Sequence, residues 1–401
     1  MIKLEKIKQA KKRLDGIIRS TPVAFAPILS KKHNAKIYLK KENLQLTGSF
    51  KLRGAFNKIA TLSQNERDQG VVAASAGNHA QGVAYSSKHF GCSATIVMPE
   101  ATPLTKVSGV KSYGADVILH GANYDESYKY AIDYAKKHNR SFVHPFADDD
   151  VISGQGTIAL EIFNEIEDID MIVVPIGGGG LISGIASVVK QLKPEIKIVG
   201  VVASGARAMK ESFEAKQPID SLFVKTIADG IAVRDTTPKM LDYVLDLVDE
   251  VVEVEDNEIA SAILFLLEQH KLVVEGAGAT GTAAIMHNKI DVKDKTVVLP
   301  LSGGNIDVTM LAQIIEKGLV KSSRKMNLVV TLIDKPGSLK KLTNIFEDLN
   351  ANIVQIDYDR DSVALDFGDA NVTIGLETKG DEHQTTIRDE LKKSGYRFKE
   401  L

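Results

Sequence analysis

Short apolar segments with the length of strands alternate with segments of helical spacing between residues 37 and 300, and this alternation limits the possible folds more than any other feature. Residues 71–74, 94–98, 171–175 and 296–300 are strand candidates of this kind. The run 171–175 is apolar throughout, as expected for a strand buried on both faces of a parallel sheet. Strands that alternate with helices predict βαβ units, and therefore an α/β fold built on a parallel sheet.

Three of these strand candidates lead into loops of small and polar residues. In open α/β sheets ligands bind at the carboxyl ends of the strands, so these loops are candidate binding segments. Glycine lets the backbone approach an anion closely, and the N-terminus of a following helix supplies partial positive charge. The loops are Ser75-Ala76-Gly77-Asn78-His79, Gly177-Gly178-Gly179-Gly180-Leu181 and Ser302-Gly303-Gly304-Asn305.

Each loop also has a simpler interpretation. The tetraglycine run and Ser302-Gly303-Gly304 could be turns without a ligand, Asn78 could cap a helix, and His79 could be a packed structural histidine. The tetraglycine run is neither the spaced fingerprint of a dinucleotide site nor a P-loop, because the acidic residue of the first and the Gly-Lys-Ser/Thr of the second are missing.

Lys51 stands at a predicted loop-to-helix junction next to the apolar Phe50. Burial of an amine lowers its pKa, which makes it a better nucleophile and a usable base. A lysine of this kind forms a Schiff base with a carbonyl cofactor, whereas an ordinary surface lysine is the alternative. Glu275 lies among small residues in Val274–Gly278 and is by itself more typical of a solvated helix end than of a binding site.

Composition excludes several classes of partner. The 50 Lys and Arg residues nearly balance 52 Asp and Glu residues, so the formal charge of −2 gives no reason to expect nucleic acid. Cys92 is the single cysteine, which excludes an intrachain disulfide and a cysteine-based metal site and indicates a reducing compartment. Since neither a signal peptide nor a run of about 18 apolar residues is present, we expect a cytoplasmic protein that does not bind membranes.

The carboxyl-terminal part of the chain has a different organisation. The polar, basic segment 317–325 predicts an interdomain linker, placed at 321–325, between a core of residues 1–320 and a domain of residues 326–401. Within the core, a small subdomain of about residues 48–150 is expected to be inserted in a larger one. Strands are predicted at 326–333, 353–358, 363–367 and 372–377, and helices at 339–349 and from 382 to 394. Their order is closest to the ferredoxin type, a β-α-β-β pattern followed by a helix.

Taken together and in this order, the motifs from about residue 5 to residue 320 resemble the fold-type-II enzymes that depend on pyridoxal 5′-phosphate (PLP). The resemblance is strongest to threonine dehydratase (threonine ammonia-lyase), whose group includes serine dehydratases and serine racemase. It implies a tryptophan synthase β-like core of two domains with twisted parallel sheets. It also implies PLP as cofactor, which requires an amine, a phosphate-binding loop and polar partners for the ring.

The resemblance assigns roles to particular residues. Lys51 would hold the PLP aldehyde carbon and act as base at the substrate Cα, and Ser302 would face the pyridine nitrogen. Because serine is neutral, it would not keep the ring protonated, which favours β-elimination over transamination. The remaining assignments are Phe50 against the ring, Asn78 at the ring hydroxyl, Gly177, Gly178, Gly179, Gly180 and Leu181 at the phosphate, Glu275 at the cofactor, and Ser75, Ala76, Gly77 and His79 around the substrate carboxylate.

Two departures from serine racemase are informative. The racemase has a second serine as acid and base on the opposite face, where this chain has Ala76, which argues against efficient racemisation. The segment matching its divalent-metal site, 202–209, contains no carboxylate and places a cation, Arg207, nearby. Hard cations prefer oxygen ligands, so we expect no metal.

The segment Asp334-Lys335-Pro336-Gly337-Ser338-Leu339 resembles the Asp-x-Pro-Gly-x-Leu turn of ACT domains, which commonly bind amino acids. An ACT-like regulatory domain would use Asp334, Pro336, Gly337 and Leu339 at its effector site, although a Pro-Gly turn needs no ligand.

The sequence therefore predicts deamination of L-threonine to 2-oxobutyrate and ammonia, with L-serine as a further substrate. It also predicts feedback by an amino acid such as isoleucine or valine, and a homodimer or homotetramer. A serine racemase, a β-replacing synthase and a non-catalytic amino-acid sensor are the alternatives. The retention of Lys51, Asn78, the tetraglycine run and Ser302 argues against the sensor.

Overall fold

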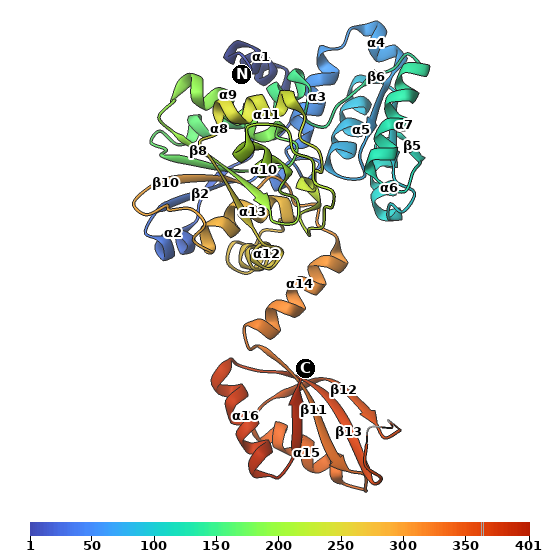
Figure 1. Cartoon of the computed structure of the whole chain (residues 1–401), viewed down its shortest axis with the longest axis vertical. Helices are drawn as coiled ribbons and strands as arrows, with labels where there is room; N and C mark the ends of the chain where they lie inside the picture. Colours follow the sequence, from blue (N-terminus) through green and yellow to red (C-terminus); the bar gives the residue numbers. More distant parts are fainter. Residues whose placement is uncertain (362, 364) are drawn as a thin grey trace. The chain divides into compact units, whose positions relative to one another are not determined.

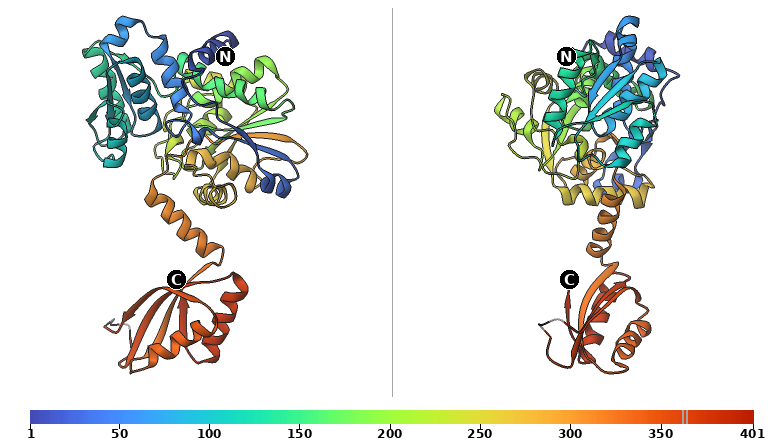
Figure 2. Two further views of the ribbon diagram at one scale, coloured as in Figure 1. Left: turned by 180° about the vertical axis from the view of Figure 1, so that it is seen from behind. Right: turned by 90° about the vertical axis from the view of Figure 1, so that its right-hand side faces the viewer.

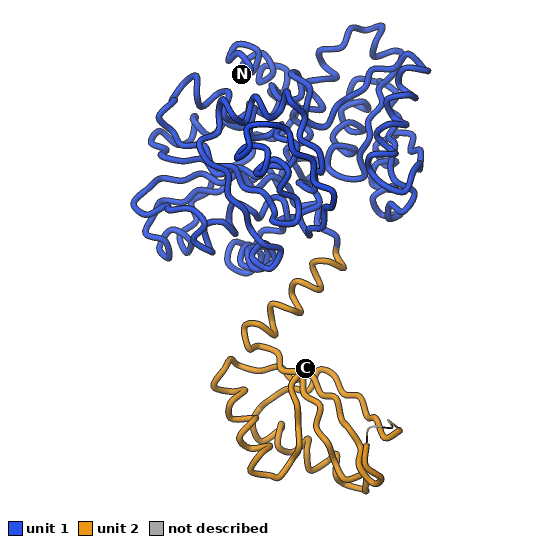
Figure 3. The backbone as a smooth tube through the Cα atoms, viewed as in Figure 1, with its two compact units in different colours: residues 1–307 blue, residues 308–401 orange. Residues whose placement is uncertain are grey.

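The computed structural model spans residues 1–401 and describes all of them except 362 and 364. It forms two compact units, residues 1–307 and 308–401 (Figure 3). Residues 308–321, which form helix α14, belong to the second unit and include part of the segment interpreted as a linker. The division into a catalytic core that ends at residue 320 and a regulatory domain that begins at residue 326 stays a prediction.

The first unit contains a six-stranded sheet in the order β1-β2-β10-β7-β8-β9 (Figure 1). Neighbouring strands are parallel except for the edge pair β1 and β2. All five residues of β7 are buried, which confirms the prediction from its uninterrupted apolar run. The strands are β1 Val23–Phe25, β2 Lys36–Lys40, β7 Met171–Pro175, β8 Lys197–Ala203, β9 Glu250–Val254 and β10 Thr296–Pro300.

A second, four-stranded parallel sheet is inserted in the chain between β2 and β7. With its helices it forms a separate lobe of the first unit (Figure 2). Its strands, in the order β5-β4-β3-β6, are β3 Val71–Ala74, β4 Ala94–Met98, β5 Asp116–Leu119 and β6 Ser141–Phe142. The α/β fold class with two parallel-sheet subdomains is thereby confirmed.

Helices flank both sheets. The 3-10 turns η1 and η2 span Glu42–Leu44 and Asp229–Ile231. The α-helices of this unit are α1 Leu4–Leu14, α2 Pro27–His33, α3 Lys51–Thr61, α4 Gln64–Gln69, α5 Asn78–Phe90, α6 Leu104–Lys111, α7 Tyr124–Lys137, α8 Asp149–Glu165, α9 Gly180–Leu192, α10 Ala208–Ala215, α11 Pro238–Leu247, α12 Asp256–His270 and α13 Gly276–Met286. Among the residues that the structure describes, no helix has the length and apolar character needed to cross a membrane.

Helix α8 is the longest element that the sequence analysis left unassigned. It packs against α1, α3 and α9, so it is buried on several sides and lacks the single apolar stripe of a surface helix. A Cβ atom on Gly154 would lie 2.4 Å from the carbonyl oxygen of Arg53, and one on Gly184 would lie 2.6 Å from that of Ile152. The glycines therefore allow three helices to approach more closely than side chains would permit.

A buried ionic cluster joins β2, η1, α3 and α8. Arg53 contacts Glu42 at 2.8 Å and Glu161 at 2.7 Å, and Lys40 contacts Glu161 at 2.6 Å. Arg53, Lys40 and Glu42 have no exposed side-chain surface. Burial opposes ionisation of Glu161, but the hydrogen bonds and charges of Arg53 and Lys40 outweigh it and lower the pKa of this carboxyl.

The second unit is an antiparallel α+β domain with the chain order β-α-β-β-α-β after helix α14. Its sheet order is β12-β13-β11-β14, and both helices supply apolar residues to the core. This arrangement agrees with the ferredoxin-like pattern predicted for an ACT-like domain. The elements are α14 Val308–Lys321, β11 Lys325–Ile333, α15 Ser338–Asp348, β12 Asn352–Asp359, β13 Asp369–Glu377, α16 Asp381–Lys393 and β14 Arg397–Glu400.

One predicted strand of this unit is wrong. Residue 364 of the segment 363–367 lies outside the described residues, and its other residues form turn and bend, with strand β13 beginning only at Asp369. Val363 and Phe367 are fully exposed, so their apolar character reflects no buried face. The final strand, β14, was not predicted.

Replacing Arg53 with methionine should lower the free energy of unfolding by about 3–5 kcal/mol, because it leaves buried carboxylates without their main partner. Urea unfolding followed by circular dichroism would measure this loss. The control is Lys197→Met, which breaks the exposed 2.6 Å pair with Glu250 and should change stability by about 1 kcal/mol or less. Equal effects of the two substitutions would contradict the importance of the cluster.

Candidate active site

The three loops predicted from the sequence line one cavity of about 700 Å³ in the first unit. They lie at the carboxyl ends of β3, β7 and β10, as the rule for parallel sheets requires. Every predicted catalytic, cofactor and substrate residue lines this cavity: Phe50, Lys51, Ser75, Ala76, Gly77, Asn78, His79, Gly177, Gly178, Gly179, Gly180, Leu181, Glu275 and Ser302.

Lys51 is the first residue of α3, and its amine lies inside the cavity. Its Nζ donates a hydrogen bond to the carbonyl oxygen of Pro145 at 2.9 Å. Desolvation lowers the pKa of Lys51 to about 8, although the charge of Glu275 opposes this shift. At neutral pH the unprotonated fraction of this amine, the form that acts as nucleophile or base, is therefore much larger than for an ordinary lysine.

The loop that carries Lys51 is tied to the loop that carries Ser302. The backbone N–H of Phe50 donates to the carbonyl oxygen of Ser302 at 3.0 Å, and Ser49 forms an isolated β-bridge with Gly303. The Phe50 ring centroid lies 5.4 Å from Nζ of Lys51. These contacts hold an amine, an aromatic face and a hydroxyl in one constellation.

Asn78 and Glu275 form the polar pair of the cavity. Nδ2 of Asn78 lies 2.8 and 2.9 Å from the two carboxylate oxygens of Glu275, and its Oδ1 accepts from Nδ2 of Asn305 at 2.6 Å. Burial raises the pKa of Glu275 to about 7, against the hydrogen bond from Asn78, which lowers it. The amide orientation of Asn78 is thus set from both ends.

The tetraglycine loop has no room for side chains. A Cβ atom on Gly178 would come within 2.5 Å of the Phe146 ring, and one on Gly177 within 2.8 Å of the backbone of Ile231. Gly179 has a φ of +86°, which favours glycine. Among the described residues, the loop amides have no protein hydrogen-bond acceptor, and helix α9 begins at Gly180. This combination forms a cradle for an anion such as a phosphate.

These observations fit PLP. One cavity contains a lysine amine of lowered pKa, a glycine loop with free amides at a helix N-terminus, and the polar side chains of Asn78 and Ser302. The distribution matches a cofactor with an aldehyde, a phosphate and a polar ring.

His79 uses its ring N–H within the protein. Its Nε2 lies 2.8 Å from the carbonyl oxygen of Val143, so this nitrogen carries the proton and donates it. Burial, followed by the charge of Lys51, lowers the pKa of His79 to about 3, so the ring stays neutral. The imidazole therefore has no N–H left for a substrate, and its predicted place beside the carboxylate stays a prediction.

Several cavity residues were not found from the sequence. His144 and Phe146 follow β6, a strand of two residues with no visible sequence signal. Two ion pairs join the small lobe to the segment 229–235: Lys106 with Asp229 at 3.2 Å, and Asp125 with Arg234 at 3.0 Å. Both pairs are partly exposed, and exposed pairs contribute little to stability. All four of these residues line the cavity.

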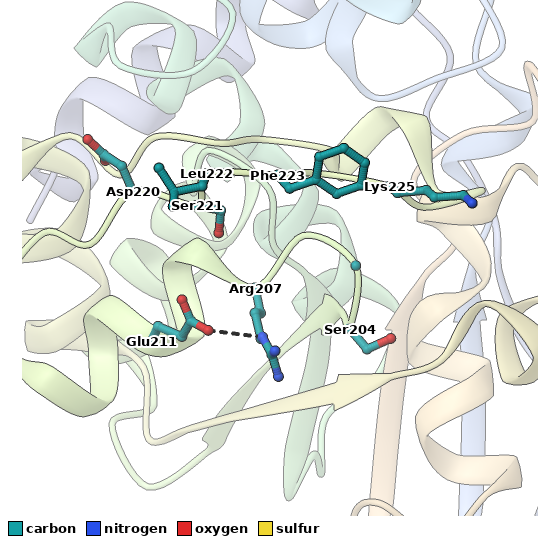
Figure 4. A pocket seen from close by; sticks show the side chains of 9 residues that line it. Ser204, Arg207, Glu211, Asp220, Ser221, Leu222, Phe223 and Lys225 are labelled. Atoms are coloured by element: carbon teal, nitrogen blue, oxygen red, sulfur yellow. Dashed lines mark ion pairs between the residues drawn. The ribbon is translucent and has the colours of Figure 1, made fainter.

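A second, more open pocket of about 310 Å³ is lined in part by the segment 202–209, for which the sequence predicted no metal site (Figure 4). Arg207 pairs there with Glu211 at 2.9 Å. In the described part of the chain, no group of three or more His, Cys, Asp and Glu side chains is arranged to hold a metal. The expected absence of a metal stays a prediction.

Comparisons with known proteins agree with this geometry. The family described as pyridoxal-phosphate dependent enzymes matches residues 14–303. L-threonine ammonia-lyase of Thermotoga maritima is 48% identical over 404 residues, which cover 99% of this chain and 98% of that protein. A catabolic L-threonine dehydratase of Staphylococcus aureus is 45% identical over 323 residues, which cover 80% of this chain and 93% of the relative.

Solved structures show the same core. The processed form of threonine deaminase isoform 2 from Solanum lycopersicum has a TM-score of 0.74 and 36% identity, covering 78% of this chain and 87% of that one. Maize serine racemase has a TM-score of 0.75 and 34% identity, and the match covers 80% of this chain and 98% of the racemase chain.

Replacing Gly178 with alanine should weaken PLP binding roughly 5- to 150-fold, from the about 1–3 kcal/mol cost of overpacking against Phe146. Titration of the apoenzyme with PLP, followed by absorbance, would measure the change. Gly109→Ala is the matched control, because a Cβ atom there meets nothing within 4 Å. Unchanged PLP affinity of the Gly178 variant would contradict a close fit of the loop around the phosphate.

Proposed function

The chain belongs to the family of pyridoxal-phosphate-dependent enzymes, among its L-threonine ammonia-lyases, and on this premise we propose how its own residues carry out the reaction. The L-threonine ammonia-lyases of this family deaminate L-threonine by β-elimination with PLP as cofactor. The observation that carries the residue assignments is the convergence of Lys51, Asn78, the tetraglycine loop and Ser302 on one cavity.

Cofactor binding is divided among these residues. The amides of Gly177–Gly180 and the N-terminus of α9 bind the phosphate, and Lys51 binds the aldehyde carbon. Phe50 packs against the ring, and Asn78, held by Glu275, faces the ring hydroxyl. When bound, PLP withdraws electrons from the Cα atom of the substrate. The neutral hydroxyl of Ser302 at the ring nitrogen limits this withdrawal and favours elimination.

Lys51 moves the proton in the reaction. With the substrate amine at the aldehyde carbon, Nζ of Lys51 would be free to remove the Cα proton of L-threonine. The lowered pKa of Lys51, about 8, lets the neutral amine serve as this base near neutral pH. Loss of the Cα proton and of the β-hydroxyl gives an enamine, and hydrolysis of the enamine gives 2-oxobutyrate and ammonia.

Substrate range and assembly extend the proposal. L-serine has the same reacting groups and gives pyruvate, whereas Ala76 provides no hydroxyl for the second acid and base of a racemase. The family resemblance supports a homodimer or homotetramer in the cytoplasm.

The second unit is proposed to respond to an amino acid such as isoleucine or valine, as in isoleucine biosynthesis. Its turn Asp334–Leu339 contains Gly337 at a φ of +89°, and Asp334 receives a hydrogen bond from Tyr358 Oη at 3.0 Å and pairs with Arg360 at 2.8 Å. The match to the Staphylococcus aureus relative covers 93% of that protein but only 80% of this chain.

Lys51→Ala should reduce 2-oxobutyrate release from L-threonine by at least about 10³-fold, because both the covalent anchor and the base are lost. It should also abolish the absorbance of covalently bound PLP. Lys58→Ala, on the same helix but outside the cavity, should retain activity. Turnover of the Lys51 variant at the wild-type rate would overturn the assignment.

Deleting residues 326–401 should preserve deamination and remove inhibition by isoleucine or valine. Allosteric coupling typically changes affinity roughly 5- to 150-fold, so the loss is measurable in initial rates. Full-length Gly337→Val, which strains a positive φ, should weaken the response without lowering basal activity. An unchanged amino-acid response in the truncated enzyme would refute the regulatory role.

A further inference from the structure

His144 has no role in the proposal above, yet it lines the cavity next to the reacting lysine. It follows β6 and directly precedes Pro145, whose carbonyl oxygen accepts the hydrogen bond from Nζ of Lys51. Its ring makes edge-on contacts with the rings of Phe146 at 4.7 Å and Tyr128 at 5.8 Å, measured between centroids. The side chain is therefore packed between aromatic rings at the wall of the site.

The tautomer of His144 is determined by its own loop. Its Nδ1 accepts hydrogen bonds from the backbone N–H groups of Phe146 at 3.1 Å and Ala147 at 2.8 Å. A nitrogen that accepts from two N–H groups carries no proton, so the proton of the neutral ring is on Nε2. Burial, followed by the charge of Lys51, lowers the pKa of His144 to about 4, so the ring is neutral at physiological pH.

The Nε2–H group has no protein partner. Among the described residues it makes no hydrogen bond, although the two accepting bonds at Nδ1 are in place. His79 shows the opposite arrangement, because its Nε2–H is used on the carbonyl oxygen of Val143. Of these two cavity histidines, only His144 has an N–H group available for a ligand.

The position of His144 indicates which part of a ligand it meets. Strand β6 pairs with β3, and the N–H of Val143 donates to the carbonyl oxygen of Val72, so His144 lies at the same sheet edge as the loop after β3. The contact between His79 and Val143 brings the first turn of α5 to this edge as well. The N-terminus of α5 is suited to a carboxylate, and His144 lies beside it.

The charges of the cavity leave a carboxylate few other partners. Lys106 and Arg234 are already paired with Asp229 and Asp125. Lys51 is required for the cofactor and for proton transfer. Neutral N–H donors are therefore favoured as partners of a substrate carboxylate, and the helix amides and the His144 ring are at hand.

We propose that His144 is a substrate-binding residue whose Nε2–H donates a hydrogen bond to the carboxylate of the amino-acid substrate, together with backbone amides at the N-terminus of α5. The inference rests on L-threonine as substrate and on the proposed role of Lys51. It shifts the side-chain contact with the carboxylate from His79, which the sequence suggested, to His144.

The test compares two variants of the full-length holoenzyme. In His144→Asn, the side-chain oxygen can still accept from the amides two and three residues on, as in an Asx turn, but its N–H₂ group takes the place of the ring Cδ2 and leaves the position of Nε2 without a donor. In His144→Ala, both functions are lost. The readouts are kcat/KM for L-threonine and the Kd of L-2-aminobutyrate, measured from the absorbance change of bound PLP. This analogue has the amine and carboxylate but lacks the β-hydroxyl.

We expect both variants to retain PLP, to lose roughly 10- to 100-fold in kcat/KM, and to bind L-2-aminobutyrate more weakly by a similar factor, as loss of a hydrogen bond to a charged group predicts. If His144→Asn kept the wild-type kcat/KM and Kd while His144→Ala lost both, the role of His144 would be in loop structure only. That result would overturn the proposal. A lower kcat/KM with an unchanged Kd of L-2-aminobutyrate would mean that His144 contacts the β-hydroxyl of the substrate. Loss of PLP from the variants would mean that His144 contacts the cofactor. Either result would also overturn it.

The test is separable from that of the proposed function. Binding of L-2-aminobutyrate needs no turnover, so the Kd can be compared even if another substrate is deaminated faster. Failure of the Lys51→Ala prediction would overturn the proposed residue roles, whereas the His144 variants address only carboxylate recognition.

Discussion

The position of helix α3 is the constraint on which the catalytic unit depends. Its first residue, Lys51, supplies the amine, and Arg53 points to nearly the opposite side because successive helical residues are about 100° apart. Arg53 is locked between Glu42 and Glu161, where buried charges require close and well-oriented partners. The glycine contacts with α8 bring the two helices together on that side. The reactive lysine is thus positioned by interactions that lie away from the cavity.

Neutral groups dominate the cavity, and this has a consequence for its chemistry. The basic side chains Lys106 and Arg234 are each paired with an aspartate, so Lys51 alone brings an unpaired amine to the reacting atoms among the described residues that line the site. In the proposed site, substrate and cofactor anions would then be bound by backbone amides, amide side chains and imidazole N–H groups. Such donors add no charge beside Lys51, whose pKa is lowered by desolvation and is raised in part by the buried carboxylate of Glu275.

Long apolar strands and the loops after them were predictable because their signals are local. β7 is apolar at every position, and a glycine run at its end has few explanations other than close backbone approach. The elements that escaped prediction have no such signal. Strand β6 has two residues, and α8 is buried on several sides, so neither shows the period that exposes one face to solvent. A strand was wrongly predicted at 363–367 because the apolar residues Val363 and Phe367 are exposed and do not mark a buried face.

The sequence by itself determined which chemistry the chain can perform, since Lys51, Asn78, the tetraglycine run and Ser302 each follow from a short motif at a strand or helix end. Only the tertiary structure decided how the neighbouring groups are used. The pKa of Lys51 depends on desolvation by segments distant in the chain, and the pairing of Asn78 with Glu275 joins residues almost 200 positions apart. The proton positions of His79 and His144 likewise depend on which backbone groups face each ring nitrogen, and no sequence pattern records that.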